Sequence, residues 1–235
     1  MITYFELIRR LKKVKELGYV KTHRTGNTGI GKTLEDLLGI KENNIPGPNA
    51  LKTELKSARK SGFSMLTLFT KSPSPPRANS VLLQKYGYEL SEENKRKILH
   101  TTVSAVRFNY LKGKPGFKIN AEEDKICLVN PQNEILGYWS KDMLRNSFEK
   151  KLPEILYVKA ETKDSGANEL FWFNEALLLR GFDFDSFIAS LKKGIILVDI
   201  RIGQYPDGRT HDHGTGFRVL PNHLDLCFQH REKVM

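Results

Sequence analysis

Cysteine is scarce in this sequence, and long apolar runs are missing. The 235 residues include only two cysteines, Cys127 and Cys227, and both lie in apolar segments. We therefore expect two reduced, buried thiols and no disulfide framework. No apolar run approaches membrane-spanning length, and the first residues have the pattern of an amphipathic helix instead of a signal peptide. These absences argue against a secreted or membrane protein and lead us to expect a cytoplasmic protein with no membrane partner.

The sequence also has no internal repeat and no long linker. A chain of 235 residues is long enough for one sizeable core, so we expect a single domain over residues 1–235. Hydrophobic residues at 39% and aromatic residues at 10% exclude a disordered chain.

Acidic side chains are fewer than basic ones, and the difference varies along the chain. The chain has 38 Lys and Arg residues against 27 Asp and Glu residues, a net charge of +11. Residues 1–60 hold 13 basic and 6 acidic side chains, whereas residues 161–200 hold 4 and 7. A basic surface on one part of the fold suits a polyanion, most often nucleic acid. A basic protein without such a partner is the alternative.

One short stretch, residues 48–56, has the alternation of a half-buried strand. Leu51, Thr53 and Leu55 fall on one face, so Glu54 and Lys56 point to the other face together. A carboxylate beside an ammonium could hold a divalent metal and orient a water molecule on it, as metal-assisted phosphodiester hydrolysis requires. The alternative is a surface strand with an ordinary ion pair.

A glycine-rich stretch, residues 26–33, matches the GxxxxGK[ST] pattern of a phosphate-binding loop. The apolar run 195–199, which ends in aspartate, could supply the second element of an NTPase. However, residues 19–25 before the pattern are polar and basic, and the expected helix runs only from about residue 33 to 38. We therefore predict a flexible turn whose amides and Lys32 meet a DNA phosphate, with a P-loop NTPase as the rival. Glu35, just beyond, could face the strand of Glu54.

Further elements follow from local patterns. Residues 64–69 read as a strand that completes a hairpin with the Glu54 strand, and residues 71–77 as a rigid rim loop. Short strands are expected between residues 101 and 139, and a helix capped by Ser140 runs to about residue 151. We expect a buried strand at 155–160, helices at 174–180 and 186–193, and a central strand at 195–202.

A second polar cluster lies in residues 201–218, which we expect to form a loop. It contains Arg201, Tyr205, His211, His213 and Arg218. Arginine and histidine can donate to base edges, so a DNA-reading loop is one interpretation. A zinc site is a second, but His223 and Cys227 do not fall at finger spacing. A third is an HNH-type nuclease site with His213, Asn222 and His230, and the last is an ordinary loop with a contact between Asp212 and a histidine.

Several of these motifs occur together and in order. They are residues 26–38, the Glu54-Leu55-Lys56 strand, and residues 66–73, 198–203 and 210–215. As a set they resemble the MvaI/BcnI family of type II restriction endonucleases, its MvaI branch more than its BcnI branch. The resemblance implies an α/β, PD-(D/E)xK nuclease fold in its MutH-like form, with a mixed central sheet flanked by helices and two lobes around a DNA cleft. It also implies a catalytic part at about residues 1–90 and a DNA-recognition part at about 100–235.

The resemblance further implies a monomer that cuts double-stranded DNA with Mg²⁺ at a short CCNGG-like site, with a cognate DNA methyltransferase in the same system. Glu54 and the Leu55 carbonyl would bind the metal, Lys56 would orient the water, and Glu35 would support the site. The residues expected to contact DNA are Lys32, Arg59, Lys71, Arg201, Tyr205, His211, His213 and Arg218.

One position departs from the family pattern. The first acidic metal ligand of the family falls here on Asn49. An amide oxygen can ligate a hard cation but brings no negative charge. We therefore expect weaker metal affinity and slower cleavage than with aspartate, unless Glu35 or Glu42 compensates. A catalytically impaired DNA-binding protein on the same fold is the alternative.

Overall fold

The structure is a computed structural model that describes residues 3–40, 53–89, 91, 95–151 and 154–235. Asn49 and Glu42, and the first part of the expected Glu54 strand, lie outside these residues. The chain forms two compact units that interleave along the sequence. The first comprises residues 1–66, 149–183 and 220–235, and the second comprises residues 67–148 and 184–219. The functional division expected at about residues 90–100 stays a prediction, because these bounds describe compactness alone.

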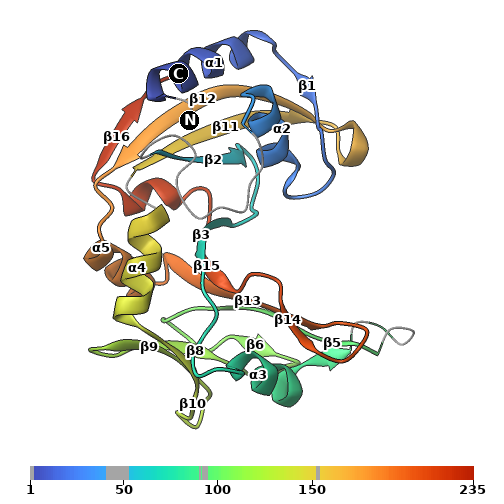
Figure 1. The fold of residues 1–235 in the computed structure, drawn as a ribbon, viewed down its shortest axis with the longest axis vertical. Coiled ribbons are helices and arrows are strands. Elements are labelled where there is room, and N and C mark those ends of the chain that lie inside the picture. Colours follow the sequence, from blue (N-terminus) through green and yellow to red (C-terminus); the bar gives the residue numbers. More distant parts are fainter. Residues whose placement is uncertain (1–2, 41–52, 90, 92–94, 152–153) are drawn as a thin grey trace. The chain divides into compact units, whose positions relative to one another are not determined.

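The first unit is built on one mixed sheet (Figure 1). Its strands follow the order β1-β12-β11-β2, and β16 pairs with β12. The elements are α1 (Tyr4–Glu16), β1 (Val20–Lys21), α2 (Gly29–Leu37), β2 (Thr53–Arg59), β11 (Glu154–Lys163), β12 (Leu170–Arg180), β16 (His230–Lys233) and the 3₁₀ turns Gly166–Asn168 and Leu224–Cys227. The β2–β11 pair is parallel, whereas β11 pairs with β12 antiparallel. The Glu54 strand is thus held by a partner from the middle of the chain.

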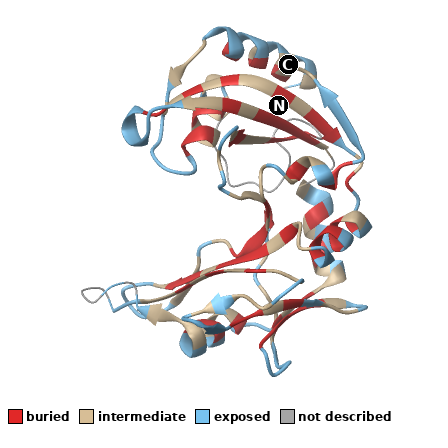
Figure 2. Ribbon diagram, turned by 180° about the vertical axis from the view of Figure 1, so that it is seen from behind, coloured by how far each residue is buried: buried red, intermediate tan, exposed pale blue. Residues whose placement is uncertain are grey.

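Helices α1 and α2 cover one face of this sheet with apolar side chains. Thr3 caps α1, because its hydroxyl accepts a hydrogen bond from the Glu6 amide at 3.2 Å. Leu7, Leu11 and Val14 recur at helical spacing and are buried. They join Leu55 and the inward residues of β11 and β12 in one core cluster. Figure 2 shows buried positions, in red, along the strands of this sheet. Because side chains alternate along a strand, Glu54 and Lys56 take the opposite face of β2.

Two local expectations are wrong in this unit. Residues 174–180 lie in strand β12, where we expected a helix. Their Glu, Ala and Leu side chains favour a helix, but β11 and β16 pair with the segment on both sides and decide its conformation. The expected hairpin is also absent, since β2 pairs with β11, whereas β3 (Leu66–Thr70) belongs to the sheet of the second unit. Local alternation predicts a strand but not its partner.

The second unit has a larger sheet, in which β13 is central as expected. Its order is β3-β15-β13-β5-β4, with β14 also on β13, and β10-β9-β8 form a separate sheet. The remaining elements are α3 (Ala78–Tyr86), β4 (Tyr88–Glu89), β5 (Lys97–Val103), β6 (Tyr110–Leu111), β7 (Lys114–Pro115), β8 (Lys118–Ala121), β9 (Lys125–Val129), β10 (Ile135–Ser140), α4 (Lys141–Lys151), α5 (Phe184–Lys192), β13 (Ile196–Gln204), β14 (Thr210–Asp212) and β15 (Gly216–Val219).

Aromatic side chains form the core of the second unit. Phe69, Phe187 and Phe217 pack with ring centroids 5.0–5.5 Å apart. The buried Trp139 indole donates to the Lys71 carbonyl at 2.8 Å and so ties the segment after β3 to this core. The cap of α4 is confirmed by the Met143 amide, which donates to the Ser140 hydroxyl at 3.2 Å.

The two cysteines are free and buried, as expected. Burial raises the pKa of the Cys127 thiol to about 11, which keeps that thiol in its unreactive form. Within the described ranges, no helix is both long and apolar enough to cross a membrane.

Candidate active site

Glu54 and Lys56 lie side by side on β2, as the alternation predicts. The Lys56 ammonium donates to Glu54 Oε1 at 2.9 Å. Glu54 is only 5% exposed. Its second oxygen, Oε2, is buried and has no hydrogen-bond partner among the described residues. The strand therefore presents a buried carboxylate that is half satisfied by a lysine.

A buried anionic oxygen without a donor is unfavourable unless something else compensates its charge. Carboxylate oxygens are the ligands that hard divalent cations such as Mg²⁺ and Ca²⁺ prefer, so the free oxygen of Glu54 fits a metal ligand. Among the described residues, no three His, Cys, Asp or Glu side chains form a group that could hold a metal ion. Glu54 supplies one candidate side-chain ligand here, and the other expected one, Asn49, lies outside the described residues.

Only the later part of the glycine-rich stretch lies in helix α2, which packs beside β2. The helix begins at Gly29, so Gly29 and Gly31 belong to its first turn, whereas Gly26 precedes the helix with a positive φ of 82°. A Cβ on Gly29 would come within 2.1 Å of the Arg24 carbonyl oxygen, which explains the glycine. The preceding strand, β1, is two residues long and lies at the sheet edge. A phosphate-binding loop would need a buried strand there and a longer helix.

The remaining candidates of the first unit contact protein groups. Lys32 pairs with Asp36 one helical turn further on, at 2.7 Å. Glu35 is half-buried on α2, the helix that packs against β2. Arg59 makes two hydrogen bonds of 2.6 and 2.7 Å with the buried Glu169 and lies over the Phe171 ring. Sequence reasoning missed Glu169, and the roles of Lys32, Glu35 and Arg59 toward DNA stay predictions.

In the second unit, a buried aspartate binds two of the predicted arginines. Asp199 is fully buried, and its Oδ2 accepts from Arg201 Nε at 2.8 Å, while Arg218 Nε lies 3.0 Å from the same oxygen. The Thr102 hydroxyl donates to Oδ1 at 2.8 Å. Sequence reasoning placed Asp199 in a possible NTPase element and in a family motif, but gave it no role toward the arginines. The spacing of Asp199 and Arg201, two residues apart on one strand face, was the signal for this role.

The predicted histidines lie in strands and a tight turn, not in one long loop as expected. The rings of His211 and His213 are 4.1 Å apart, and the Tyr205 hydroxyl lies 2.6 Å from His211 Nδ1. His100, which no sequence motif indicated, faces His213 with the two ring centroids 6.2 Å apart. A Cβ on Gly203 would come within 2.7 Å of His213 Nε2, so this glycine makes room for the ring.

Asp212 holds the turn in place through hydrogen bonds to partners other than the histidine of the ordinary-loop interpretation. It accepts hydrogen bonds from the Ser72 hydroxyl at 2.6 Å, the Asn79 amide at 2.8 Å and the Gly214 and Thr215 backbone amides at 2.9 and 2.6 Å. Lys71 is half-buried beside this turn, and its backbone amide donates to the Thr215 carbonyl at 3.0 Å. Arg201, Tyr205, His211, His213 and Arg218 are therefore presented by one rigid, hydrogen-bonded segment.

The lowered pKa values of two histidines predict that the free energy of unfolding decreases in mild acid. Burial, and then the nearby Arg201 and His213, lower the pKa of His100, while burial and then His211 lower that of His213. The unfolded chain therefore binds more protons below about pH 6.5, and stability falls as the pH drops from 7 through the lowered pKa values. We expect His100→Gln to flatten the dependence of urea-unfolding free energy on pH between 5 and 7. An unchanged slope would contradict this assignment.

A mixed α/β fold that sets a carboxylate and a lysine on one strand face could serve an enzyme that hydrolyses phosphodiesters. Comparisons with known proteins place the chain more narrowly. Residues 8–228 match the model of the MvaI/BcnI restriction endonuclease family. A search of curated proteins found no match.

Two solved structures are similar along the whole chain. The restriction endonuclease MvaI in complex with its cognate DNA substrate is 35% identical, with a TM-score of 0.85 and full coverage of both chains. MvaI in the absence of DNA is 36% identical, with a TM-score of 0.59 and coverage of all of this chain and 99% of that one. The chain belongs to the MvaI/BcnI restriction endonuclease family, which confirms the resemblance. It is a type II restriction endonuclease, a site-specific deoxyribonuclease.

Proposed function

We propose that this endonuclease cuts double-stranded DNA in a Mg²⁺-dependent reaction at a short CCNGG-like site, acting as a monomer. The observation that carries the proposal is the buried Glu54 oxygen without a donor in the described part of the chain, next to the Lys56 ammonium. The cognate DNA bound to the similar MvaI supports a duplex substrate. Host DNA with the same site would need protection, so we expect a cognate DNA methyltransferase in the same system.

Glu54, the Leu55 carbonyl and Asn49 would hold the Mg²⁺, which supplies an activated water and stabilises negative charge on the phosphate. Lys56 donates into the same space, so it can orient the attacking water or the phosphate oxygen. Its hydrogen bond to Glu54 fixes the ammonium on the strand face. Glu35 on α2 would support the site from a helix that contacts β2.

Arg201 and Arg218 are pre-oriented by Asp199, and the exposed His213 and Tyr205 lie beside them on the same segment. Such a set of fixed donors suits the reading of base edges and phosphates. Lys32, Arg59, Lys71 and His211 are the further candidates for DNA contacts. Lys32 and Arg59 would exchange or share their carboxylate partners with a phosphate.

The test is incubation of supercoiled plasmid with the protein in Mg²⁺ and in EDTA. We expect discrete fragments in Mg²⁺ and none in EDTA. Lys56→Ala should lower the cleavage rate by at least about 10²-fold because a donor to the reacting groups is lost. The exposed Lys13→Ala on α1 is the matched control and should cut at the wild-type rate. Fragments of random length would contradict sequence-specific cleavage.

The second candidate function, an impaired DNA-binding protein, is favoured by Asn49 alone. Asn49→Asp adds a negative charge to the metal site and should accelerate cleavage. If the wild type and Asn49→Asp both bind duplex DNA and neither cuts it, the protein is a binding module on a nuclease fold.

A further inference from the structure

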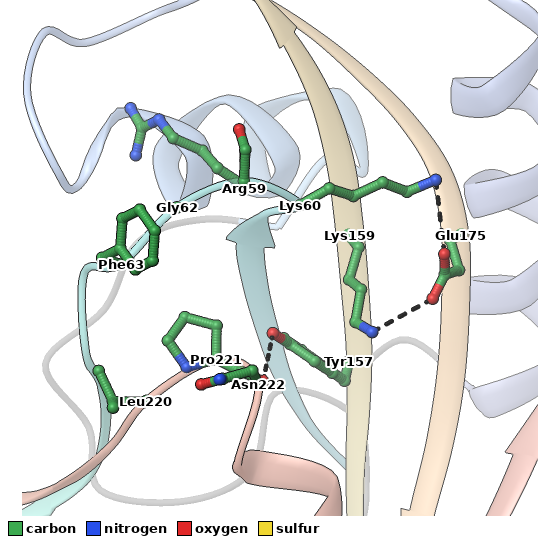
Figure 3. Close-up of a pocket in the computed structure, with 11 residues that line it drawn as sticks. Arg59, Lys60, Gly62, Phe63, Tyr157, Lys159, Glu175, Leu220, Pro221 and Asn222 are labelled. Carbon is green, nitrogen blue, oxygen red and sulfur yellow. Dashed lines mark hydrogen bonds and ion pairs between the residues drawn. The ribbon is translucent and has the colours of Figure 1, made fainter.

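A pocket lies next to the candidate active site in the first unit (Figure 3). It is formed by the end of β2 and the turn after it, by Tyr157 and Lys159 of β11, by Glu175 of β12, and by residues 220–222. Its volume is about 380 Å³, which falls in the range of small-molecule sites. Tyr157 is the sheet neighbour of Lys56, and Lys159 is the neighbour of Ala58. Neighbours in register share a face of the sheet, so the pocket opens beside the proposed catalytic lysine.

The pocket has an apolar wall with an exposed aromatic ring. Phe63 lies in the turn that follows β2 and is 90% exposed. Figure 3 shows its ring on one side of the pocket, with Leu220 and Pro221 along the adjoining wall. The turn is held by the Gly62 amide, which donates to the Arg59 carbonyl at 3.1 Å. A single exposed aromatic residue needs no explanation by itself. An aromatic ring in a pocket wall beside a nuclease site, however, can pack against a base of the nucleic acid.

The opposite wall of the pocket is polar. Lys159 and Lys60 lie 3.3 and 3.4 Å from the two oxygens of Glu175, as Figure 3 shows. Lys60 also approaches Glu161 at 3.4 Å, a half-exposed pair of little strength. Although burial acts to raise the pKa of Glu175, the two lysines lower it, which agrees with a carboxylate that holds both ammonium groups. Lysines held in this way present N–H donors to a phosphate.

A hydrogen bond of Tyr157 holds one side of the pocket in place, and the exposed amide side chain of Asn222 lies at its edge. The Tyr157 hydroxyl donates to the Pro221 carbonyl at 3.3 Å and so attaches residues 220–222 to the sheet. Burial raises the pKa of Tyr157, so the hydroxyl remains a donor. The Asn222 side chain is exposed at the mouth, and no hydrogen bond of it occurs within the described residues. This amide can therefore donate to or accept from a base edge or a sugar oxygen.

We propose that this pocket is a subsite for one nucleotide of the DNA substrate adjoining the scissile phosphate. Phe63 and Pro221 contact its sugar and base, Lys159 and Lys60 contact its phosphate, and Asn222 contacts its polar edge. The inference rests on the proposed cleavage of duplex DNA by the Glu54 site. It adds a substrate contact from the catalytic unit that is independent of the arginine and histidine segment at residues 201–218.

The experiment combines protein variants with locally modified substrates. Phe63→Ala and Lys159→Gln are compared with the wild type on a series of full-length cognate duplexes that carry, at one position at a time, an abasic sugar or an uncharged methylphosphonate. Binding is measured in Ca²⁺ and cleavage in Mg²⁺. We expect each variant to bind the unmodified duplex about tenfold more weakly and to raise KM with little change in kcat. The defect of Phe63→Ala should vanish on the duplex whose abasic sugar lies at the contacted nucleotide, and that of Lys159→Gln on the duplex whose methylphosphonate lies there. Phe63→Tyr should restore binding.

Two control variants separate this contact from general effects. Phe5→Ala removes another exposed phenylalanine, 84% exposed on α1, and Lys163→Gln removes an exposed lysine from the same strand as Lys159. Both should bind every duplex as the wild type does. Equal binding by Phe63→Ala and the wild type on all duplexes would overturn the subsite, as would a defect of equal size on every modified duplex.

A free deoxynucleoside monophosphate that occupies the pocket as tightly as duplex DNA would assign it to a small-molecule ligand and would also overturn the proposal. Failure of the subsite is distinguishable from failure of the proposed function. If the wild type cuts plasmid DNA and Phe63→Ala binds and cuts equally well, only the subsite is wrong. If the wild type neither cuts nor binds duplex DNA, both proposals are wrong.

Discussion

Glu54→Gln should lower the rate of DNA cleavage by about 10³-fold or more, the largest effect expected of any single substitution in this chain. The change keeps the size of the side chain but removes the negative charge from an oxygen that is buried and has no hydrogen-bond partner among the described residues. Lys56 would keep a neutral acceptor or lose its partner. Both changes weaken the hold on a divalent cation.

The measurement should include a readout other than cleavage. Because Ca²⁺ resembles Mg²⁺ in its oxygen ligands, we expect the wild type to bind a cognate duplex more tightly in Ca²⁺ than in EDTA. Glu54→Gln should lose this difference while it keeps the affinity seen in EDTA. The exposed Glu16→Gln on α1 is the matched control and should behave as the wild type does. A Ca²⁺ effect that survives in Glu54→Gln would remove Glu54 from the metal site.

Asp199→Asn should destabilise the second unit by about 3 kcal/mol. The fully buried carboxylate compensates the charges of Arg201 and Arg218 and accepts from Thr102. In the variant, the guanidinium groups of Arg201 and Arg218 stay close together, but the carboxylate between them is replaced by a neutral amide. Their side chains are 36% and 22% exposed, so water relieves part of this cost. We therefore expect a value at the low end for a broken buried ion pair.

Urea unfolding of the variant and the wild type measures this cost. The matched control is Asp207→Asn, which breaks the exposed ion pair with Arg209 on the neighbouring turn and should cost less than about 1 kcal/mol. Asp199→Asn should also weaken duplex binding, because Arg201 and Arg218 lose their fixed orientation. Equal unfolding midpoints for the two variants would show that Asp199 is not the anchor of this segment.

The candidate site was predictable from the sequence to the extent that it is local. Glu54 and Lys56 are two residues apart on one strand, so alternation alone places them together, and the structure confirms their contact. Thr3 and Ser140 mark helix starts through side chains that reach only three residues along the chain. The motifs around these residues were enough to indicate the family, which the comparisons confirm.

Contacts between distant parts of the chain were not predictable in this way. The β2–β11 pair joins residues about a hundred positions apart, and local alternation contains no information about such a partner. The same holds for Glu169 beside Arg59, Ser72 and Asn79 beside Asp212, and His100 beside His213. Residues 174–180 became a strand because neighbouring strands outweighed their intrinsic helix propensity.

The sequence by itself thus determined the mixed α/β class, the positive charge, the paired Glu54 and Lys56 and the family, since each depends on composition or on residues close together in the chain. The tertiary structure decided which strands pair, which cations are neutralised by buried carboxylates, and that Phe63, Lys159 and Asn222 surround one pocket. These features depend on burial and on register between distant segments, and both arise only when the chain has folded.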